Sequence, residues 1–452
     1  MTPLMAPPAQ ITTLSLRRQR RAIAFSLFVA KISGRPMSEV EPLSRSAART
    51  TAAGLPTFAS LSLPQFRLLL LGTVLSQLFG WMEEVARGWL VWSLSHSPLQ
   101  LQLLAFTSAF SRFLSAPVAG FLTDRLERRF LAAATQAGQA VLAMGVGVLA
   151  TSGHIQLWHL YLINPFWASM NSINLTVRQA LVYDVVGPRY LTNAVGLNSV
   201  AANVCRISAP TLGGAIIGTL GVEAAYYCQA VLLLASVPVT LLLRLVVSSQ
   251  PVRVPFLQGL RESIDHLRSD PALLRLMAMN YVPNVLIYPY VTLLPEFAER
   301  VLKSGPQGYG VLLTGVGFGS IPGGLLVASM TGWRRKGLAM TLAAALYMGM
   351  VAVFSQSRLF PLSFAALVVA GVGWSMMVGL NQTLVQLRLP EEMRGRGLGL
   401  YNLAPGLGML GNLAMGGAAQ WLGVQTAVAS FALSGLCLSL FLGLGGREVR
   451  RL

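Results

Sequence analysis

Five ionisable residues lie inside long apolar stretches of the sequence, where charged side chains are rare. Glu83, Glu84 and Arg87 share one stretch, and Arg112 and Arg206 lie in two others. An ionisable group at the depth of a membrane costs at least ~2.5 kcal/mol, so such groups usually face a cavity and act there. Carboxylates among arginines can bind protons or the charged groups of a ligand. These five residues are therefore the candidate site.

The spacing of these residues allows an ion pair between two helices. If the first two stretches form an antiparallel hairpin, Arg112 lies within about one helical turn, roughly 5 Å, of Glu83 and Glu84. Adjacent residues on a helix point about 100° apart, so only one carboxylate can face Arg112 well, while Arg87 can reach either from the next turn.

One carboxylate is therefore expected to be structurally paired, and the other to bind a proton or face the substrate. A proton and a cationic substrate would then compete for it. The alternative is that both carboxylates lie near the outer mouth in water and matter little.

Twelve apolar stretches must position these residues. Apolar residues make up 54% of the chain and charged residues only 11%, which excludes a soluble globular protein. Stretches of about 20 apolar residues form membrane helices, because a bilayer offers no hydrogen bonds to the backbone. Arginines occupy almost every second gap, and basic residues near helix ends are retained in the cytoplasm. This pattern, which only Arg300, Lys303 and Arg358 break, predicts an all-α membrane protein with twelve transmembrane helices and cytoplasmic termini.

The net charge of +18 does not indicate a nucleic-acid partner, because the cations are dispersed in short clusters beside the apolar stretches. We interpret them as topology signals that face the lipid bilayer. The three cysteines have no metal-ligand spacing, and the sequence has no phosphate-binding P-loop. We expect neither a metal nor a cofactor, and ATP is not expected as the direct energy source.

An internal repeat divides the twelve stretches into two halves. Gln179-Ala-Leu-Val recurs as Gln382-Thr-Leu-Val, Gly213-Gly214 as Gly416-Gly417, and Leu220-Gly-Val as Leu422-Gly-Val, at an offset of 202 to 203 residues. With six stretches per half, the copies have the same orientation and are related by an axis along the membrane normal. The expected parts are a basic, disordered cytoplasmic tail (1–62), two six-helix bundles (63–247 and 274–446), a cytoplasmic linker with an amphipathic helix (248–273) and a short cytoplasmic tail (447–452).

Three motifs resemble a known family. The segment Gly120-Phe-Leu-Thr-Asp124-Arg125-Leu-Glu127-Arg128-Arg129 resembles the G-x-L-x-D-R-x-G-R-R signature of the major facilitator superfamily, with Glu127 in place of the usual glycine. The region that begins with Arg178-Gln-Ala-Leu-Val resembles the bacterial exporter branch, which includes enterobactin-type siderophore and macrolide efflux proteins. Ala209-Pro210-Thr-Leu-Gly213-Gly214 is similar to the exporters' fifth-helix G-P-x-x-G-G motif, with Ala209 in place of the first glycine. The resemblance covers about residues 64 to 445.

The resemblance implies a major facilitator fold of two pseudo-symmetric bundles and a secondary transporter rather than an enzyme. Proton-coupled export of a small molecule, either a drug or a siderophore-like compound, is expected, by a monomer in the bacterial cytoplasmic (inner) membrane that works by alternating access. An importer or a lipid-handling facilitator on the same fold is the alternative, because fold does not determine cargo or direction.

The charge balance of the candidate site bears on the cargo. Three arginines against two carboxylates favour an anionic or zwitterionic cargo, such as a catechol siderophore, over a lipophilic cation. Alternatively, Arg206 is a fixed structural partner. Five amide side chains could line a central path or equally fill packing seams between helices: Asn171, Asn174, Asn198, Asn203 and Asn381.

The motif residues are expected to control conformation. Asp124 would act as a latch by pairing with Arg125, Arg128 or a neighbouring helix end when the cytoplasmic side is closed. Its alternative is a solvated loop carboxylate. The expected latch region comprises Gly120, Asp124, Arg125, Arg128, Arg129 and Arg178.

The fifth-stretch motif has a simpler expected role. Pro210 permits a bend, and Gly213 and Gly214 allow neighbouring helices to approach closely, which plain helix packing would also require.

Overall fold

The computed structural model describes residues 58–244, 267, 270–330, 332–333, 335–390 and 394–445. The chain divides into two compact units, residues 1–59 and residues 60–452. Only the last two residues of the first unit are described, so the helical fold below belongs to the second unit. The expected N-terminal tail lies almost wholly outside the described residues, as do most of the linker and the whole C-terminal tail.

Five helices form the first half of the second unit. After a short 3-10 turn, η1 (Ala59–Ser62), they are α3 (Pro64–Ser95), α4 (Pro98–Arg125), α5 (Arg128–Thr151), α6 (Leu157–Leu220) and α7 (Val222–Leu241). Long apolar runs keep their backbone groups in helical hydrogen bonds, as a bilayer requires. α6 is two helices joined at a kink, where Gly187 has φ 65° and ψ 179° and Pro188 follows. A positive φ is a conformation that glycine adopts readily.

The second half begins with a helical segment that prolines divide into short pieces. These are α9 (Pro271–Val282), the π-helical turn η2 (Pro283–Ile287), the 3-10 turn η3 (Tyr288–Leu293), α10 (Leu294–Glu296) and the π-helical turn η4 (Phe297–Val301). Pro283, Pro289 and Pro295 fall at the first or second position of three pieces, where each removes a backbone donor. The chain continues through α11 (Gly305–Ser329), α12 (Lys336–Gln356), α13 (Phe360–Arg388), α14 (Arg394–Tyr401), α15 (Ala404–Leu422) and α16 (Val424–Gly445).

The described part of the chain is helical apart from turns and bends, and it contains no strand. Nine of the described helices are long and apolar enough to cross a membrane, and one of these, α6, bends back at Gly187 to form two arms. Residues 271–301 and 394–422 are built from shorter pieces. The predicted all-α membrane architecture is confirmed, and the count of twelve crossings stays a prediction.

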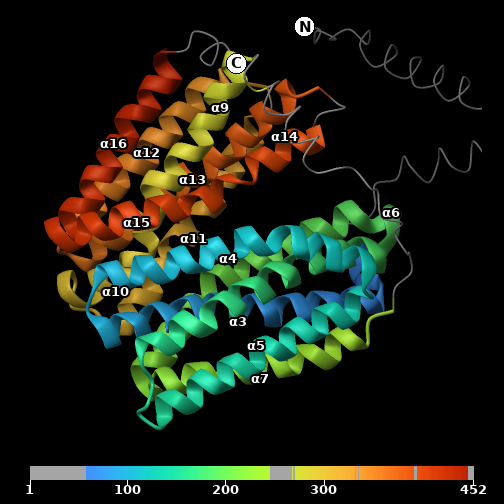
Figure 1. Cartoon of the computed structure of the whole chain (residues 1–452). Helices are drawn as coiled ribbons and strands as arrows, with labels where there is room; N and C mark the ends of the chain where they lie inside the picture. Colours follow the sequence, from blue (N-terminus) through green and yellow to red (C-terminus); the bar gives the residue numbers. More distant parts are fainter. Residues whose placement is uncertain are drawn as a thin grey trace, which may run out of the picture. The chain divides into compact units, whose positions relative to one another are not determined.

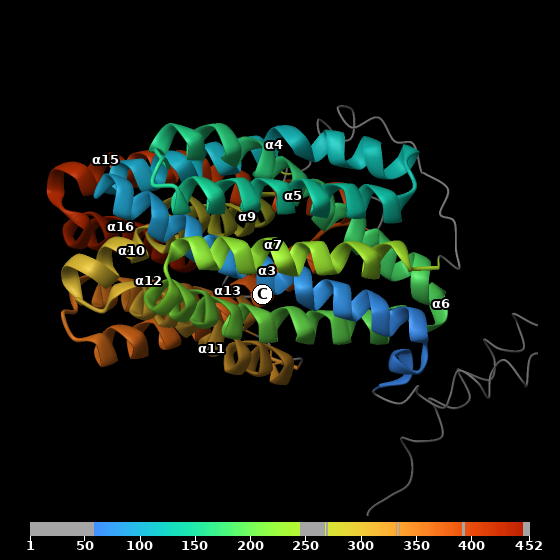
Figure 2. The same cartoon turned by 90° about the horizontal axis from the view of Figure 1, so that it is seen from below.

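The two halves pack against each other along two pairs of helices (Figure 1 and Figure 2). Within the first half, α3 packs against α6 and α7, and within the second, α13 packs against α11 and α12. Between the halves, α6 packs against α11 and α4 against α15. The repeat relates α4 to α11 and the second arm of α6 to α15, so these two interfaces are equivalent, as two pseudo-symmetric halves require.

Among the described residues, the halves share a buried apolar cluster at the end of the helices where α3 ends and α4 begins, which we call the closed end. One apolar cluster there contains Trp92, Ile217 and Tyr309 and so joins both halves. Towards the opposite end, the open end, each half has a cluster of its own, around Val177 in the first half and Val385 in the second. In the part of the chain that the structure describes, the apolar core therefore joins the halves at the closed end, and the clusters at the open end each belong to one half.

Candidate functional site

Arg87 links the two carboxylates of α3. Its Nε donates to Glu83 Oε1 at 2.8 Å, and its Nη2 donates to Glu84 Oε2 at 2.8 Å. The expected ion pair between one carboxylate and Arg112 is not among the contacts of the described residues. The physical reason is spacing, because Arg87 lies three and four residues further along the same helix and reaches both carboxylates first.

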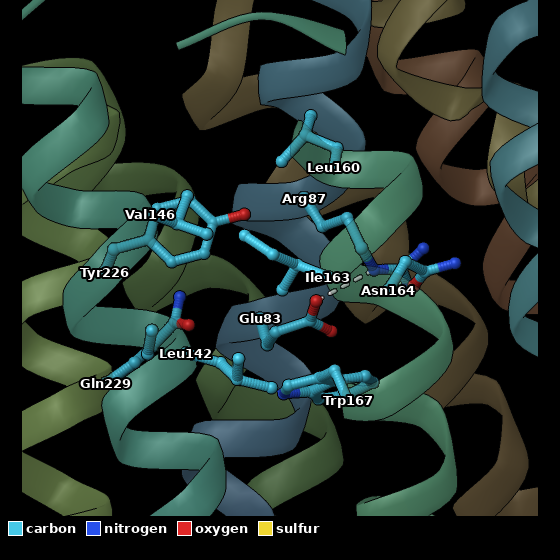
Figure 3. Close-up of a pocket in the computed structure, with 11 residues that line it drawn as sticks. Glu83, Arg87, Leu142, Val146, Leu160, Ile163, Asn164, Trp167, Tyr226 and Gln229 are labelled. Carbon is cyan, nitrogen blue, oxygen red and sulfur yellow. Dashed lines mark hydrogen bonds and ion pairs between the residues drawn. The ribbon is translucent and has the colours of Figure 1, made fainter. Parts of the chain in front are cut away.

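Glu83 lies in a small pocket inside the first half. Figure 3 shows its carboxylate among Asn164, Trp167, Tyr226 and Gln229, with Arg87 beside it. Glu83 is only 4% exposed, and its Oε2 has no hydrogen-bond partner among the described residues. Gln229 is fully buried in the same pocket and its amide is also unpartnered among them. Burying a polar atom without a hydrogen bond costs free energy, so the unpartnered atoms of Glu83 and Gln229 distinguish this pocket from an ordinary helix-packing seam.

Glu84 faces a different environment, although it shares Arg87 with Glu83. Its side chain is 33% exposed. Glu84 and Arg112 lie close enough to interact electrostatically with each other and with Tyr288, which belongs to the second half. The expectation that the two carboxylates point in different directions agrees with this geometry, in which Glu83 faces inward and Glu84 faces the other half.

A cavity lies between the halves beyond Glu84. It has a volume of about 220 Å³, and its lining includes Trp81 and Arg206 from the first half and Tyr288, Tyr347 and Trp374 from the second. An adjoining cavity of about 570 Å³ shares Arg206 and Trp374 and extends between α6, α11 and α13. Arg206 is the only charged residue that lines either cavity in the described part of the chain.

The amide residues divide between this cavity and the packing seams. Asn203 lines the larger cavity. Asn174 lies inside the first half, where its Nδ2 donates to Thr135 Oγ1 at 2.9 Å, and Asn381 lies inside the second, where its Nδ2 donates to the Leu276 carbonyl at 2.9 Å. Asn171 and Asn198 are not among the residues that line the two cavities. Asn174 and Asn381 therefore make hydrogen bonds between packed helices, and Asn203 is the one of the five amides that lines either of these two cavities.

The arginines of the motif at the end of α4 make contacts within the first half. Arg128 pairs with Asp184 on the first arm of α6, with Nη1 2.7 Å from Oδ2, and Arg129 pairs with Glu127. Arg125 lies over the ring of Phe121 at 4.1 Å from its centroid. Gly120 and Asp124 both lie on α4. The side chain of Asp124 lies outside the described part of the structure, so its role as a latch stays a prediction.

Asp184 was not singled out from the sequence, although it is a single acid in an apolar run. A signal was available, since it lies three residues before the Gly187-Pro188 kink. Arg178, also placed in the expected latch, lies inside the first half instead, where it donates to Asn174 Oδ1 at 3.1 Å and Thr73 Oγ1 at 3.2 Å.

The fifth-stretch glycines lie where helices approach most closely. A Cβ on Gly213 would lie 3.3 Å from Met82 Cα of α3, and one on Gly214 would lie 2.5 Å from the Pro306 carbonyl. Across the same interface, a Cβ on Gly310 would lie 2.3 Å from the Pro210 carbonyl. The expected close approach is present: Gly213 brings α6 close to α3 within the first half, and Gly214 brings it close to α11 of the second half.

A charged cluster at the closed end was not foreseen from the sequence. Trp92 Nε1 donates to Glu299 Oε2 at 3.0 Å, and the guanidinium of Arg300 lies over the Trp92 ring at 4.7 Å. Arg300 also donates to the His96 carbonyl at 2.9 Å and to Glu296 Oε1 at 3.3 Å. The signal was Arg300 itself, one of the three cations that break the charge alternation.

Known proteins resemble this chain over nearly its whole described length. A family model described as transmembrane secretion effector matches residues 55–447. The enterobactin exporter EntS of Salmonella typhi is 26% identical over 401 residues, which cover 86% of this chain and 94% of that protein. The MFS-type transporter YfiS of Bacillus subtilis (strain 168) is 25% identical over 395 residues, which cover 83% and 91%.

A solved structure of the nucleoside transporter NupG matches with a TM-score of 0.70 at 12% identity, and the match covers 84% of this chain and 98% of that chain. At that identity the likeness shows the fold alone. Together with the family match, it confirms the fold that the motifs at Gly120 and Pro210 predicted. The chain belongs to the transmembrane secretion effector family, in the bacterial exporter branch of the major facilitator superfamily.

Proposed function

We propose that the protein exports a small molecule across the bacterial cytoplasmic membrane by alternating access, in exchange for protons. The observation that carries the proposal is the cavity around Arg206, which lies between the halves and adjoins a larger cavity lined by α6 and α11. The open end carries Arg128, Arg129 and Arg388, so the positive-inside rule assigns it to the cytoplasm. Cargo would enter from there and leave when the closed end separates.

Glu83 is the proton-binding group in this proposal. It is buried, one of its oxygens has no partner among the described residues, and it contacts Arg87, which also holds Glu84. Protonation of Glu83 would release one of the two contacts of Arg87. Because Arg87 also binds Glu84, a change at Glu83 reaches the side of α3 that faces the second half. This coupling through Arg87 differs from the mechanism expected from the sequence, in which a proton and the substrate compete directly for one carboxylate.

Two features of the closed end support the alternating movement. The cluster of Trp92, Glu299 and Arg300 links α3 to the segment 271–301 through polar contacts that can be broken and re-formed. The glycine contact between Gly214 and Gly310 allows the backbones of α6 and α11 to lie close enough to serve as a hinge.

Transport in proteoliposomes tests the proposal. The full chain would be reconstituted, a pH gradient imposed, and flux measured for a panel of siderophores and macrolides that includes enterobactin, the cargo named for EntS. We expect proton-driven flux of at least one compound, reduced at least about tenfold in Glu83→Gln, since general proton-transfer groups contribute roughly 10²-fold or more.

The matched control for that experiment is Glu223→Gln, which removes a carboxylate in the first turn of α7. It is expected to transport like the wild type. Full proton-driven flux in Glu83→Gln would contradict the assignment of proton binding to Glu83, and full flux in Glu84→Gln as well would exclude this pair of carboxylates from coupling. Flux only in the inward direction would favour an importer, the alternative function.

A further inference from the structure

The cavity between the halves has an aromatic lining. Its rings are contributed by four separate elements: Trp81 of α3, Tyr288 and Tyr290 of η3, Tyr347 of α12 and Trp374 of α13. Trp374 lies at the centre of the group, with ring centroids 5.2 Å from Tyr347 and 6.0 Å from Tyr288. Tilted rings at these separations leave ring faces and edges available to a flat ligand.

The charge of this lining is positive. Arg206 is partly buried and lines both adjoining cavities. Its side chain makes no hydrogen bond or ion pair with any residue that the structure describes, whereas Arg87, Arg128 and Arg178 are all held by polar partners. A guanidinium without a protein partner offers its planar set of donors to an anionic group of a ligand.

The neighbouring charges agree with this assignment. Arg112 lies near Tyr288, and in the described part of the chain its side chain also has no ion pair within 4.0 Å. Glu84, the carboxylate that interacts with Tyr288, is already bound by Arg87 at 2.8 Å. Arg87, Arg112 and Arg206 therefore outnumber Glu83 and Glu84 by one positive charge in this neighbourhood.

We propose that this cavity binds planar aromatic anions, whose anionic group pairs with Arg206 while the rings stack on Trp374 and Tyr288. The inference deepens the proposed function and rests on it, because it names the substrate class of the same cavity. It differs from a lipophilic-cation site, in which a carboxylate would line the cavity beside the rings. The ligand needs both an anionic group and an aromatic ring, so an aliphatic anion or an aromatic cation should bind weakly.

Three probes separate charge from aromaticity. Naphthalene-2-sulfonate is flat and stays anionic at all working pH values, cyclohexanesulfonate keeps the anion without the aromatic ring, and 2-naphthylmethylammonium keeps the ring with the opposite charge. Binding of each to the purified full chain in detergent would be measured by calorimetry at fixed pH. We expect naphthalene-2-sulfonate to bind at least about tenfold more tightly than either of the others, a difference of about 1.4 kcal/mol.

Variants then locate the site. Arg206→Gln should weaken binding of naphthalene-2-sulfonate at least about tenfold, and Arg206→Lys should restore part of it because it restores the charge. Trp374→Leu should weaken it about fivefold or more, while Trp374→Phe keeps most of the affinity. Arg358→Gln is the matched control, because Arg358 is an exposed cation in the loop before α13 and lines neither cavity.

Thermal unfolding of each variant shows whether it folds, and only folded variants are compared. Equal affinity of Arg206→Gln and wild type, or equal affinity for naphthalene-2-sulfonate and cyclohexanesulfonate, would overturn the inference. Because binding is measured without a gradient, the result is independent of proton coupling. A protein that binds the probe yet shows no flux would contradict the proposed function and leave the aromatic-anion site standing.

Discussion

At the scale of single residues, the site depends on one guanidinium shared by two carboxylates. Arg87 compensates Glu83, which is buried, and Glu84, whose side chain is 33% exposed. Breaking a buried pair by removing one partner costs about 3–5 kcal/mol, because the remaining charge stays in a poorly solvating environment. That these three residues act together could be predicted from their spacing. The spacing left both Arg87 and Arg112 as possible partners, and the structure pairs both carboxylates with Arg87.

This arrangement predicts the effect of removing Arg87 on stability. Arg87→Gln should lower the free energy of unfolding by about 3–5 kcal/mol, since it leaves two adjacent carboxylates without their cation. Thermal unfolding in detergent would measure it, with Arg67→Gln, an exposed arginine near the start of α3, as the control. The double variant Glu83→Gln/Arg87→Gln should recover part of the loss. An unchanged unfolding midpoint in Arg87→Gln would show that the pair does not hold the site together.

At the scale of helices, the contact of α6 with α11 has no room for a side chain at Gly310. A methyl group there would lie 2.3 Å from the Pro210 carbonyl and 3.1 Å from Gly214 Cα, both backbone atoms. Gly310→Ala should therefore destabilise the protein by about 1–3 kcal/mol and reduce transport, as overpacking does elsewhere.

Gly80→Ala is the matched control, because a Cβ on Gly80 of α3 would meet nothing within 4 Å. It should be neutral or slightly stabilising, since alanine is favoured over glycine inside a helix. If Gly310→Ala were as stable and active as Gly80→Ala, the two helices would not pack as closely as described.

The start of α9 is fixed by an acid that also joins it to α13. Asp270 Oδ1 accepts hydrogen bonds from the backbone N–H groups of Ala272 and Leu273 at 3.0 and 3.3 Å, and Oδ2 accepts one from Arg388 Nε at 2.9 Å. The hydrogen bond from Arg388, followed by those from the backbone, lowers the pKa of Asp270 below its ordinary value, although burial opposes the shift.

A lowered pKa in the folded state sets the direction of the pH dependence. The stabilisation by Asp270 is fully present above the unfolded pKa of about 3.9 and is lost as the pH falls through the lower folded pKa. In Asp270→Asn, the unfolding midpoint should therefore decline less between about pH 6 and pH 3 than it does in the wild type. Asp270→Ala also removes the helix cap, so its free energy of unfolding should be lower by about 0.5–2 kcal/mol. Parallel pH profiles of Asp270→Asn and wild type would refute this role.

At the scale of the whole molecule, apolar stretches and charge alternation were enough to predict an all-α membrane protein, and the motif resemblance implied the major facilitator fold. Stretches of membrane length, the repeat at an offset of 202 to 203 residues and the motifs at Gly120 and Pro210 all follow local rules that a single sequence displays. The equivalent α4–α15 and α6–α11 interfaces agree with two pseudo-symmetric halves. Residues 271–301 were counted as one of the twelve membrane helices. Their division into short helical pieces follows from Pro283, Pro289 and Pro295 only when the three prolines are considered together.

The binding cavity could not be predicted in the same way. Trp81, Tyr288, Tyr347 and Trp374 come from segments far apart in the sequence: the last three meet by packing within the second half, and Trp81 joins them across the two halves. The pairing of Arg128 with Asp184 and of Trp92 with Glu299 likewise crosses between helices that no local pattern connects. Arg206 was found because a single charge in an apolar stretch is visible without any knowledge of its neighbours.

Cross-linking of the closed end tests most directly whether transport requires the halves to separate there. Ser97 Oγ lies 3.1 Å from Gln420 Oε1 across the halves, so cysteines at these two positions could be joined by a short, reducible bifunctional reagent after Cys205, Cys228 and Cys437 are replaced. The control pair is Gln356→Cys/Gln425→Cys, which lies within the second half, where Gln356 Nε2 is 3.1 Å from the Gln425 carbonyl. Cross-linking across the halves should abolish flux and reduction should restore it, while the control pair should transport when cross-linked. Undiminished flux with the closed end locked would contradict alternating access in this protein.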